Sequence, residues 1–370
     1  MPPNDHADLL QEGERIMRIC NACRYCEGYC AVFPAMERRQ NFLPGDLNYL
    51  ANLCHNCGEC YYACQYAPPH EFAVNVPQLL ADLRVQSYAQ FTWPGFFAKA
   101  FRANGTLALV LTVCLIAPVL TRTLPPAPNF YRVVPHRVMV GLFGTASLLI
   151  LLAFSIGLAR FWRNTGERLS ALLNPAALWT ACKDVLTLHY LDGGGGGCAY
   201  PAARQSQSRR WFHQFTMYGF GLCFASTTSA AFDYYLLAWK APNPYLSAPV
   251  ILGTLGGIAL IIGTLGLLAL KFIRNPATQG TAQTGMDLAF LSLLFLSSAT
   301  GLALLALRET SRMPKLLVLH LATVLALFLT LPCGKFVHAI YRSAALVKYA
   351  LETRLARHSP VTSRHSPKNQ

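Results

Sequence analysis

The chain has 370 residues, of which 53% are hydrophobic and only 13% are charged, and its net charge is +14. Soluble domains carry about 25% charged residues, so this composition argues against a wholly soluble protein and predicts that part of the chain lies in lipid. The positive charge does not indicate nucleic-acid binding, because the basic residues are scattered over short connections between long apolar segments, as in loops that flank membrane spans.

The N-terminal segment differs from the rest of the chain. Residues 1–100 hold 10 acidic and 7 basic residues, whereas residues 101–370 hold 7 acidic and 24 basic residues. The segment from Met1 to Arg18 has no apolar stretch and carries four acids, so it does not resemble a secretory signal peptide. We therefore expect this region to stay in the cytoplasm, where thiols remain reduced and clustered cysteines are metal ligands rather than disulfides.

Two cysteine quartets with the same spacing lie 34 residues apart. They are Cys20, Cys23, Cys26 and Cys30, followed by Cys54, Cys57, Cys60 and Cys64. In each quartet, three cysteines at intervals of three precede a fourth after a longer interval. In two-cluster ferredoxins, the first three bind one four-iron cluster and the fourth binds the other cluster. The spacing therefore predicts two [4Fe–4S] clusters that exchange their fourth ligands.

The predicted ligand sets are Cys20, Cys23, Cys26 and Cys64 for one cluster, and Cys54, Cys57, Cys60 and Cys30 for the other. Zinc is the main alternative, but structural zinc sites favour two separated Cys-x2-Cys pairs. The proline that often follows the fourth cysteine is replaced by Ala31 and Gln65, which suggests a different local turn. We interpret His55 as a surface residue that tunes the cluster potential. Residues 1–76 are thus expected to form a small α-rich, two-cluster ferredoxin-like domain.

An all-α six-helix transmembrane bundle is expected over residues 103–348, because six apolar segments approach the roughly 20 residues that cross a bilayer. The predicted spans are 103–122, 136–159, 212–238, 248–271, 286–307 and 316–341. Residues 77–102 are predicted to contain an amphipathic connecting helix that lies against the membrane surface or a partner.

Two further segments are predicted to be irregular. Residues 189–205 form a flexible, glycine-rich cytoplasmic loop in which a partner could dock. Its run Gly193–Gly197 lacks the Lys-Ser/Thr of a phosphate-binding loop, and no strand precedes it. Residues 349–370 are expected to form a disordered tail, since they are rich in Ser, Pro, His and Arg towards the end.

Charge placement predicts the orientation of the bundle. Connections on the N-terminal side carry many basic residues, such as Arg160, Arg209 and Arg274, whereas the opposite connections carry fewer, such as Arg132 and Lys240. Basic residues concentrate on the cytoplasmic side of a membrane. We therefore predict a multi-pass protein of the bacterial inner (cytoplasmic) membrane, with the clusters and both termini in the cytoplasm.

Histidines in or beside the spans are candidate haem ligands, because ionisable groups inside a membrane are costly and tend to be functional. His213 begins the third span and His338 lies at the same depth in the sixth, so we expect them to bind one b-type haem beneath the clusters. His320 would lie about 27 Å from His338 along one helix. It would need His136 as its partner for a second haem, and His189 is an alternative inner ligand. The competing interpretation is that these histidines are interfacial anchors.

Taken together, these features resemble the tricarballylate-utilisation protein B family, also called citrate-utilisation B, over nearly the whole chain. The segments that carry the resemblance are CNACRYCEGYC, LCHNCGECYYACQYAPPHEFAVNVP, RRWFHQFTMYGFGLCFASTTSAAFDYY and HLATVLALFLTLPCGKFVHAIYR. The last segment is also similar to the haem helix of nitrate reductase gamma subunits, in which two histidines of one helix serve two haems. Cys223 stands where a second histidine pair would be completed.

The family resemblance implies that the chain reoxidises the reduced FAD of a partner dehydrogenase, which makes cis-aconitate from tricarballylate. Electrons would pass through the clusters and haem to membrane quinone. The chain is then an electron carrier rather than a substrate-converting enzyme, and it has no Gly-x-Gly-x-x-Gly fingerprint for a flavin of its own. Two alternatives are a membrane subunit of a reductase complex and a redox sensor that uses the clusters structurally.

Overall fold

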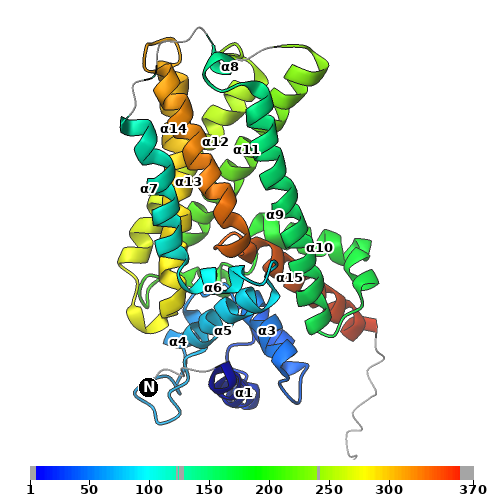
Figure 1. Ribbon diagram of the computed structural model, residues 1–370. Helices are drawn as coiled ribbons and strands as arrows, with labels where there is room; N and C mark the ends of the chain where they lie inside the picture. The colour runs from blue at the N-terminus through cyan, green and yellow to red at the C-terminus, as the bar shows by residue number, and fades with distance from the viewer. Residues whose placement is uncertain (1–5, 122–123, 125–128, 240–241, 359–370) are drawn as a thin grey trace, which may run out of the picture.

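The computed structural model describes residues 6–121, 124, 129–239 and 242–358, and these residues are mostly helical (Figure 1). The N-terminal helices are α1 (His6–Cys23), α2 (Val32–Glu37), α3 (Pro44–Leu53), α4 (Glu59–Tyr62), α5 (Val76–Phe91) and α6 (Phe97–Arg102). The next helices are α7 (Asn104–Thr121), α8 (Phe130–Val133), α9 (His136–Asn164), α10 (Pro175–Thr187), α11 (Ser208–Leu236), α12 (Ala248–Phe272), α13 (Thr281–Leu307), α14 (Met313–Thr330) and α15 (Val337–His358). Short 3-10 turns are η1 (Leu169–Leu173), η2 (Gly193–Gly195), η3 (Pro276–Thr278) and η4 (Leu331–Cys333), and β1 (Cys198–Ala199) pairs antiparallel with β2 (Gln205–Ser206).

Five of the described helices are long and apolar enough to cross a membrane, so the chain has the character of a membrane protein. They span Asn104–Thr121, His136–Asn164, Ala248–Phe272, Gln283–Leu307 and Met313–Cys333. Exposed apolar side chains such as Leu109, Leu148 and Leu255 project from them, as expected for surfaces that face lipid. The long helices form a bundle at one end of the molecule, and the N-terminal helices lie at its other end (Figure 1).

The third predicted span corresponds to α11, which is 29 residues long but does not meet the same criterion of apolarity. Its polar side chains find partners close by: Ser226 Oγ donates to the Pro249 carbonyl at 2.6 Å, and Thr228 Oγ1 donates to its own helix. The helix packs on α12 at backbone distance, because a Cβ added at Gly256 would lie 2.9 Å from a backbone nitrogen of α11. Such small-residue contacts are typical of helix pairs in membranes.

The sixth predicted span, 316–341, is wrong as a single helix. Helix α14 ends at Thr330, and α15 begins only at Val337. The break lies at Pro332, which lacks the N–H that a continuing helix needs, and Gly334 follows in an extended conformation. His320 and His338 therefore lie on different helices, so the likeness to a haem helix that carries both histidines does not hold.

Helix α15 leaves the bundle and runs beside the N-terminal helices and α10 (Figure 1). It continues to His358, so residues 349–358 are helical and do not begin a disordered tail. Tertiary contacts explain the difference, because the Glu352 carboxylate accepts hydrogen bonds from Arg39 at 2.6 Å and from the Tyr49 hydroxyl at 3.1 Å. Residues 359–370 lie outside the described residues.

The connecting helix predicted between the two parts is α5. Asn75 caps its start by accepting a hydrogen bond from the Gln78 N–H. Leu80, Leu83 and Tyr88 are buried, and so is Arg84. Because α5 packs against α1, α3, α9 and α13, most of its side chains are buried within the protein. The N-terminal helices, α5 and α15 share one hydrophobic core, which fixes the cysteine loops against the bundle.

Candidate functional site

The two cysteine quartets gather around two adjoining cavities beneath the bundle. We call them the first and second cysteine cavities. The first is lined by Cys20, Cys23, Cys26 and Cys64, and the second by Cys30, Cys54, Cys57 and Cys60; Cys60 also borders the first. The space not filled by protein atoms is about 800 Å³ in the first and about 360 Å³ in the second. Each cavity thus draws its cysteines from both quartets, as the predicted exchange of Cys30 and Cys64 requires.

Local backbone geometry shapes the cysteine loops. Cys20 and Cys23 lie on the last turn of α1, and Arg24 then adopts a left-handed conformation with φ of 56°. In the second loop, Asn56 has φ of 56° and Gly58 has φ of 85°. A Cβ at Gly58 would lie 2.6 Å from the Ala199 carbonyl oxygen, so only glycine fits there. These turns let closely spaced thiols point into one cavity.

Burial and neighbouring thiols change the acidity of the cysteines that line the first cysteine cavity. Burial, followed by the neighbouring Cys26 and Cys64, raises the pKa of Cys20 to about 12. Burial together with Cys64 and Cys23 raises the pKa of Cys26 to about 12. Bare thiols would therefore stay protonated at neutral pH, whereas bound metal deprotonates a coordinating thiol outright. Within the described residues, no group of three or more Cys, His, Asp or Glu is arranged to hold a single metal ion. Ligands of a cubane stand further apart, because each thiolate binds a different iron.

Arginines surround the loop Cys54–Cys57. Arg84 and Arg342 both donate to the Cys54 carbonyl, at 2.7 and 2.6 Å. Arg209 donates to the carbonyls of His55 and Asn56, at 2.8 and 2.7 Å. Arg84, Arg209 and Arg342 thus tie the second cysteine cavity to α5, α11 and α15, respectively. The interpretation of His55 as a surface residue is wrong: it is buried, and burial, with Arg342 and Arg209, holds its pKa well below the usual value.

The glycine-rich segment covers the second cysteine cavity rather than forming a free loop. Asp192 caps the turn Gly193–Gly195, and the β1–β2 hairpin follows. Cys198 is fully buried in the same cluster as Cys57. Gln205 donates to the Glu59 carboxylate at 2.6 Å. These contacts with the cysteine loops explain why the segment is ordered.

His213 and His338 come together at the base of the bundle. Their ring centroids are 6.2 Å apart, and the ring planes are inclined by 82°. Two imidazoles bound on opposite sides of one metal, with metal–nitrogen bonds of about 2.0–2.1 Å, place their ring centres about 6 Å apart. His338 Nδ1 donates to the Lys335 carbonyl at 2.5 Å, which leaves Nε2 available, and such a second hydrogen bond is usual for a metal-ligating histidine. The donor set therefore fits a haem iron.

The other candidate histidines are not brought into pairs. His320 contacts the Thr300 hydroxyl at 3.1 Å, whereas His136 stacks on Tyr234 at 4.0 Å between centroids. Among the described residues, no ring contact joins His320 to His136. His189 is exposed and packs against its neighbour Tyr190.

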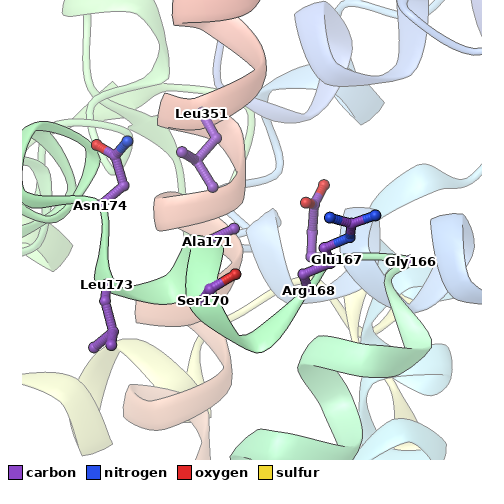
Figure 2. A pocket seen from close by; sticks show the side chains of 8 residues that line it. All are labelled: Gly166, Glu167, Arg168, Ser170, Ala171, Leu173, Asn174 and Leu351. Carbon is purple, nitrogen blue, oxygen red and sulfur yellow. The ribbon is translucent and has the colours of Figure 1, made fainter.

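A further pocket, in which the space not filled by protein atoms is about 810 Å³, lies on the segment that joins α9 to α10 and is closed on one side by Leu351 of α15 (Figure 2). Its lining residues are Gly166, Glu167, Arg168, Ser170, Ala171, Leu173, Asn174 and Leu351. None is a cysteine or histidine, so this pocket offers no thiolate for an iron–sulfur cluster and no imidazole for a haem iron.

Sequence reasoning missed the arginines around Cys54–Cys57 and the burial of Cys198. Arg209 and Arg274 were explained as charges that flank membrane spans, and Cys198 only followed a glycine run. No local pattern marks these residues, since they approach the cysteine loop from distant parts of the chain.

Comparison with known proteins supports this architecture. Residues 13–90 match the family model "Citrate utilization protein B Fer4-like domain", and residues 98–359 match the model "Citrate utilization protein B". The chain is 48% identical over 363 residues to the "Citrate utilization protein B" of Escherichia coli, covering 95% of this chain and 94% of that protein. No solved structure matches it.

Fold and site together define a protein with a Fer4-like N-terminal domain and membrane-type helices, compatible with iron–sulfur electron transfer. The chain belongs to the citrate utilization protein B family. The resemblance on which this family was predicted is therefore confirmed.

Proposed function

We propose that the chain carries electrons from a reduced FAD-dependent dehydrogenase to quinone in the bacterial inner membrane. The observation that carries the proposal is the gathering of four cysteines around each of two adjoining cavities. Two [4Fe–4S] clusters, when bound there, supply one-electron transfer. The first cysteine cavity lies nearer to the surface, since Cys23 is exposed, and it is the side on which a flavoprotein docks.

His213 and His338 extend the proposal towards the membrane. Their separation and the hydrogen bond of His338 support one b-type haem held between α11 and α15. His55 lies in the second cysteine loop and interacts electrostatically with His213, so the two parts of the site are neighbours. We propose one haem only, because in the part of the chain that the structure describes His320 contacts Thr300 whereas His136 stacks on Tyr234.

We also propose six membrane crossings. Five are the apolar helices named above, and the other is α11, whose composition does not meet the criterion of apolarity for a membrane span. The helix begins where Arg209 contacts the second cysteine loop and leads towards the end of the bundle where α12 begins (Figure 1). Six crossings and the basic connections favour a cytoplasmic location for the clusters and both termini. The name of the relative and the resemblance to tricarballylate utilisation favour a partner dehydrogenase that acts on a tricarboxylate.

The test is anaerobic purification of the full-length protein followed by metal analysis and reduction. We expect about eight irons per chain in two clusters, which a reduced flavoprotein reduces and a quinone reoxidises. Cys23→Ser should disturb one cluster, whereas Cys182→Ser, at an exposed cysteine of α10, should leave both intact. Stoichiometric zinc without iron–sulfur absorption would contradict the proposal. Clusters that exchange no electrons with flavin or quinone would favour a structural or sensing role.

A further inference from the structure

Four guanidinium groups converge on the loop that begins with Cys54 and ends at Cys57. Arg84 comes from α5, Arg209 from the start of α11 and Arg342 from α15, and each donates to backbone carbonyls of the loop. Arg274 follows α12 and donates to the Asn56 side chain at 2.6 Å. Arg84 and Arg274 are buried, so water screens their charges poorly.

These charges are not balanced by carboxylates. Within the described residues, none of the four arginines forms an ion pair. Arg209 and Arg274 instead lie over the Tyr200 ring, at 4.6 and 4.8 Å from its centroid. Glu59 is an acid on the same loop segment, but one carboxylate leaves the set strongly positive.

The first cysteine cavity has a different electrostatic environment. On α1, which carries Cys20 and Cys23, Arg15 pairs with Glu12 and Arg18 pairs with Glu14, each at 2.6 Å. These pairs are largely exposed, and Cys23 is exposed as well. The charges near this cavity are therefore paired or screened by water.

An excess of buried positive charge around one cavity affects electron transfer. A thiolate-bound cluster is anionic, and it gains one further negative charge on reduction, so nearby positive charge raises its reduction potential. With an effective dielectric constant of about 20, one unit charge about 10 Å away favours the reduced form about tenfold. Burial acts in the opposite direction, because it disfavours charge. Four guanidiniums, opposed by the Glu59 carboxylate, together favour the reduced form of the cluster by roughly a thousandfold. This effect is large enough to offset the penalty that burial imposes on the reduced form.

We infer that Arg84, Arg209, Arg274 and Arg342 set the reduction potential of the cluster in the second cysteine cavity and keep it at or above that of the first. The inference rests on the proposed function. These are positioning residues that act through the loop, and they direct electrons from the exposed first cavity towards His213 and His338. Without them, burial would leave the electron on the first cluster.

The test is a redox titration of the purified full-length protein, followed by electron paramagnetic resonance. Arg209→Gln removes one charge and Arg209→Lys keeps it. Arg132→Gln is the control, because it also removes one positive charge, but from an exposed residue of α8 at the other end of the bundle (Figure 1). Cys23→Ser identifies the signal of the first cluster, since it alters a ligand of that cavity only. We expect Arg209→Gln to shift the equilibrium of the second cluster about tenfold towards the oxidised form, equivalent to about 59 mV for a one-electron couple.

The first cluster should keep its potential in Arg209→Gln, and Arg209→Lys and Arg132→Gln should leave both potentials within a small fraction of that shift. Unchanged potentials in Arg209→Gln with full iron content, or equal shifts of both clusters, would overturn the inference. If Arg209→Gln loses iron, Arg274→Gln provides the same comparison from a different segment. A wild-type protein without two cluster signals would instead refute the proposed function.

Discussion

The proposed haem site depends on two histidine side chains, His213 and His338. A hydrogen bond from the ring of His338 to the backbone fixes the orientation of that ring. His338 uses Nδ1 to donate to the Lys335 carbonyl, whereas His213 Nδ1 has no hydrogen-bond partner within the described structure. The two rings nevertheless lie 6.2 Å apart, from helices more than a hundred residues apart in sequence. A fixed ring and a facing partner are what axial ligation of a haem iron requires.

At this scale we predict that His338→Ala removes the dithionite-reduced b-type spectrum of the purified protein, because one axial ligand is lost. Iron in the clusters should stay unchanged, since no cysteine is altered. His189→Ala is the control, because His189 is exposed and, among the described residues, its ring contact is with Tyr190 and not with another histidine. A full b-type spectrum in His338→Ala would show that the haem lies elsewhere or is absent.

At the scale of elements, α15 connects the bundle to the cysteine cavities. It carries His338 and Arg342 near its start and Glu352 near its end. Glu352 binds Arg39 at 2.6 Å and also lies 3.5 Å from Arg38, and its side chain is 17% exposed. The hydrogen bonds of this carboxylate to a charged partner contribute about 1.5–3 kcal/mol, because they are partly shielded from water.

We therefore predict that Glu352→Ala destabilises the N-terminal helices by about 2 kcal/mol. The measurement is the denaturant concentration at which cluster absorption is lost. Glu14→Ala is the matched control: the Glu14–Arg18 pair has the same 2.6 Å distance but is largely exposed, so its loss should cost less than about 1 kcal/mol. Equal losses in the two variants would mean that α15 does not hold the domain.

For the whole molecule, the decisive feature is the placement of the N-terminal helices, whose loops line both cysteine cavities, at one end of the helical bundle (Figure 1). Helix α11 begins beside the second cavity, where Arg209 contacts the cysteine loop, and leads towards the start of α12. A helix of 29 residues reaches about 43 Å, which exceeds the thickness of a bilayer core. Within this helix, Ser226 donates to the Pro249 carbonyl of α12 and Thr228 donates to its own backbone, which lowers the cost of placing these hydroxyls in lipid.

At this scale we predict that the connection between α11 and α12 faces the side opposite to the cysteine cavities. A reporter that is active only outside the cytoplasm should be active when inserted at residues 237–247 and inactive when fused after residue 358. An insertion between α9 and α10 is the control, since it should also be inactive. An inactive reporter at residues 237–247 would exclude α11 as a membrane span.

The sequence by itself determined those features of the protein that depend on residues close together in the chain. Cysteine spacing predicted two sets of four ligands, and apolar length predicted helices at all six segments, of which five meet the criterion for spanning. The quoted motifs predicted the family, and matching depths predicted the approach of His213 and His338. Each of these follows from local periodicity or from the fixed rise of a helix.

Only the tertiary structure decided which distant residues meet. It broke the sixth segment at Pro332 and turned α15 back onto the N-terminal domain, where Glu352 orders residues expected to be a tail. It buried His55 and Cys198, and it brought Arg84, Arg209, Arg274 and Arg342 around one loop. The physical reason is that burial and electrostatic environment arise from packing between elements, which no local spacing encodes.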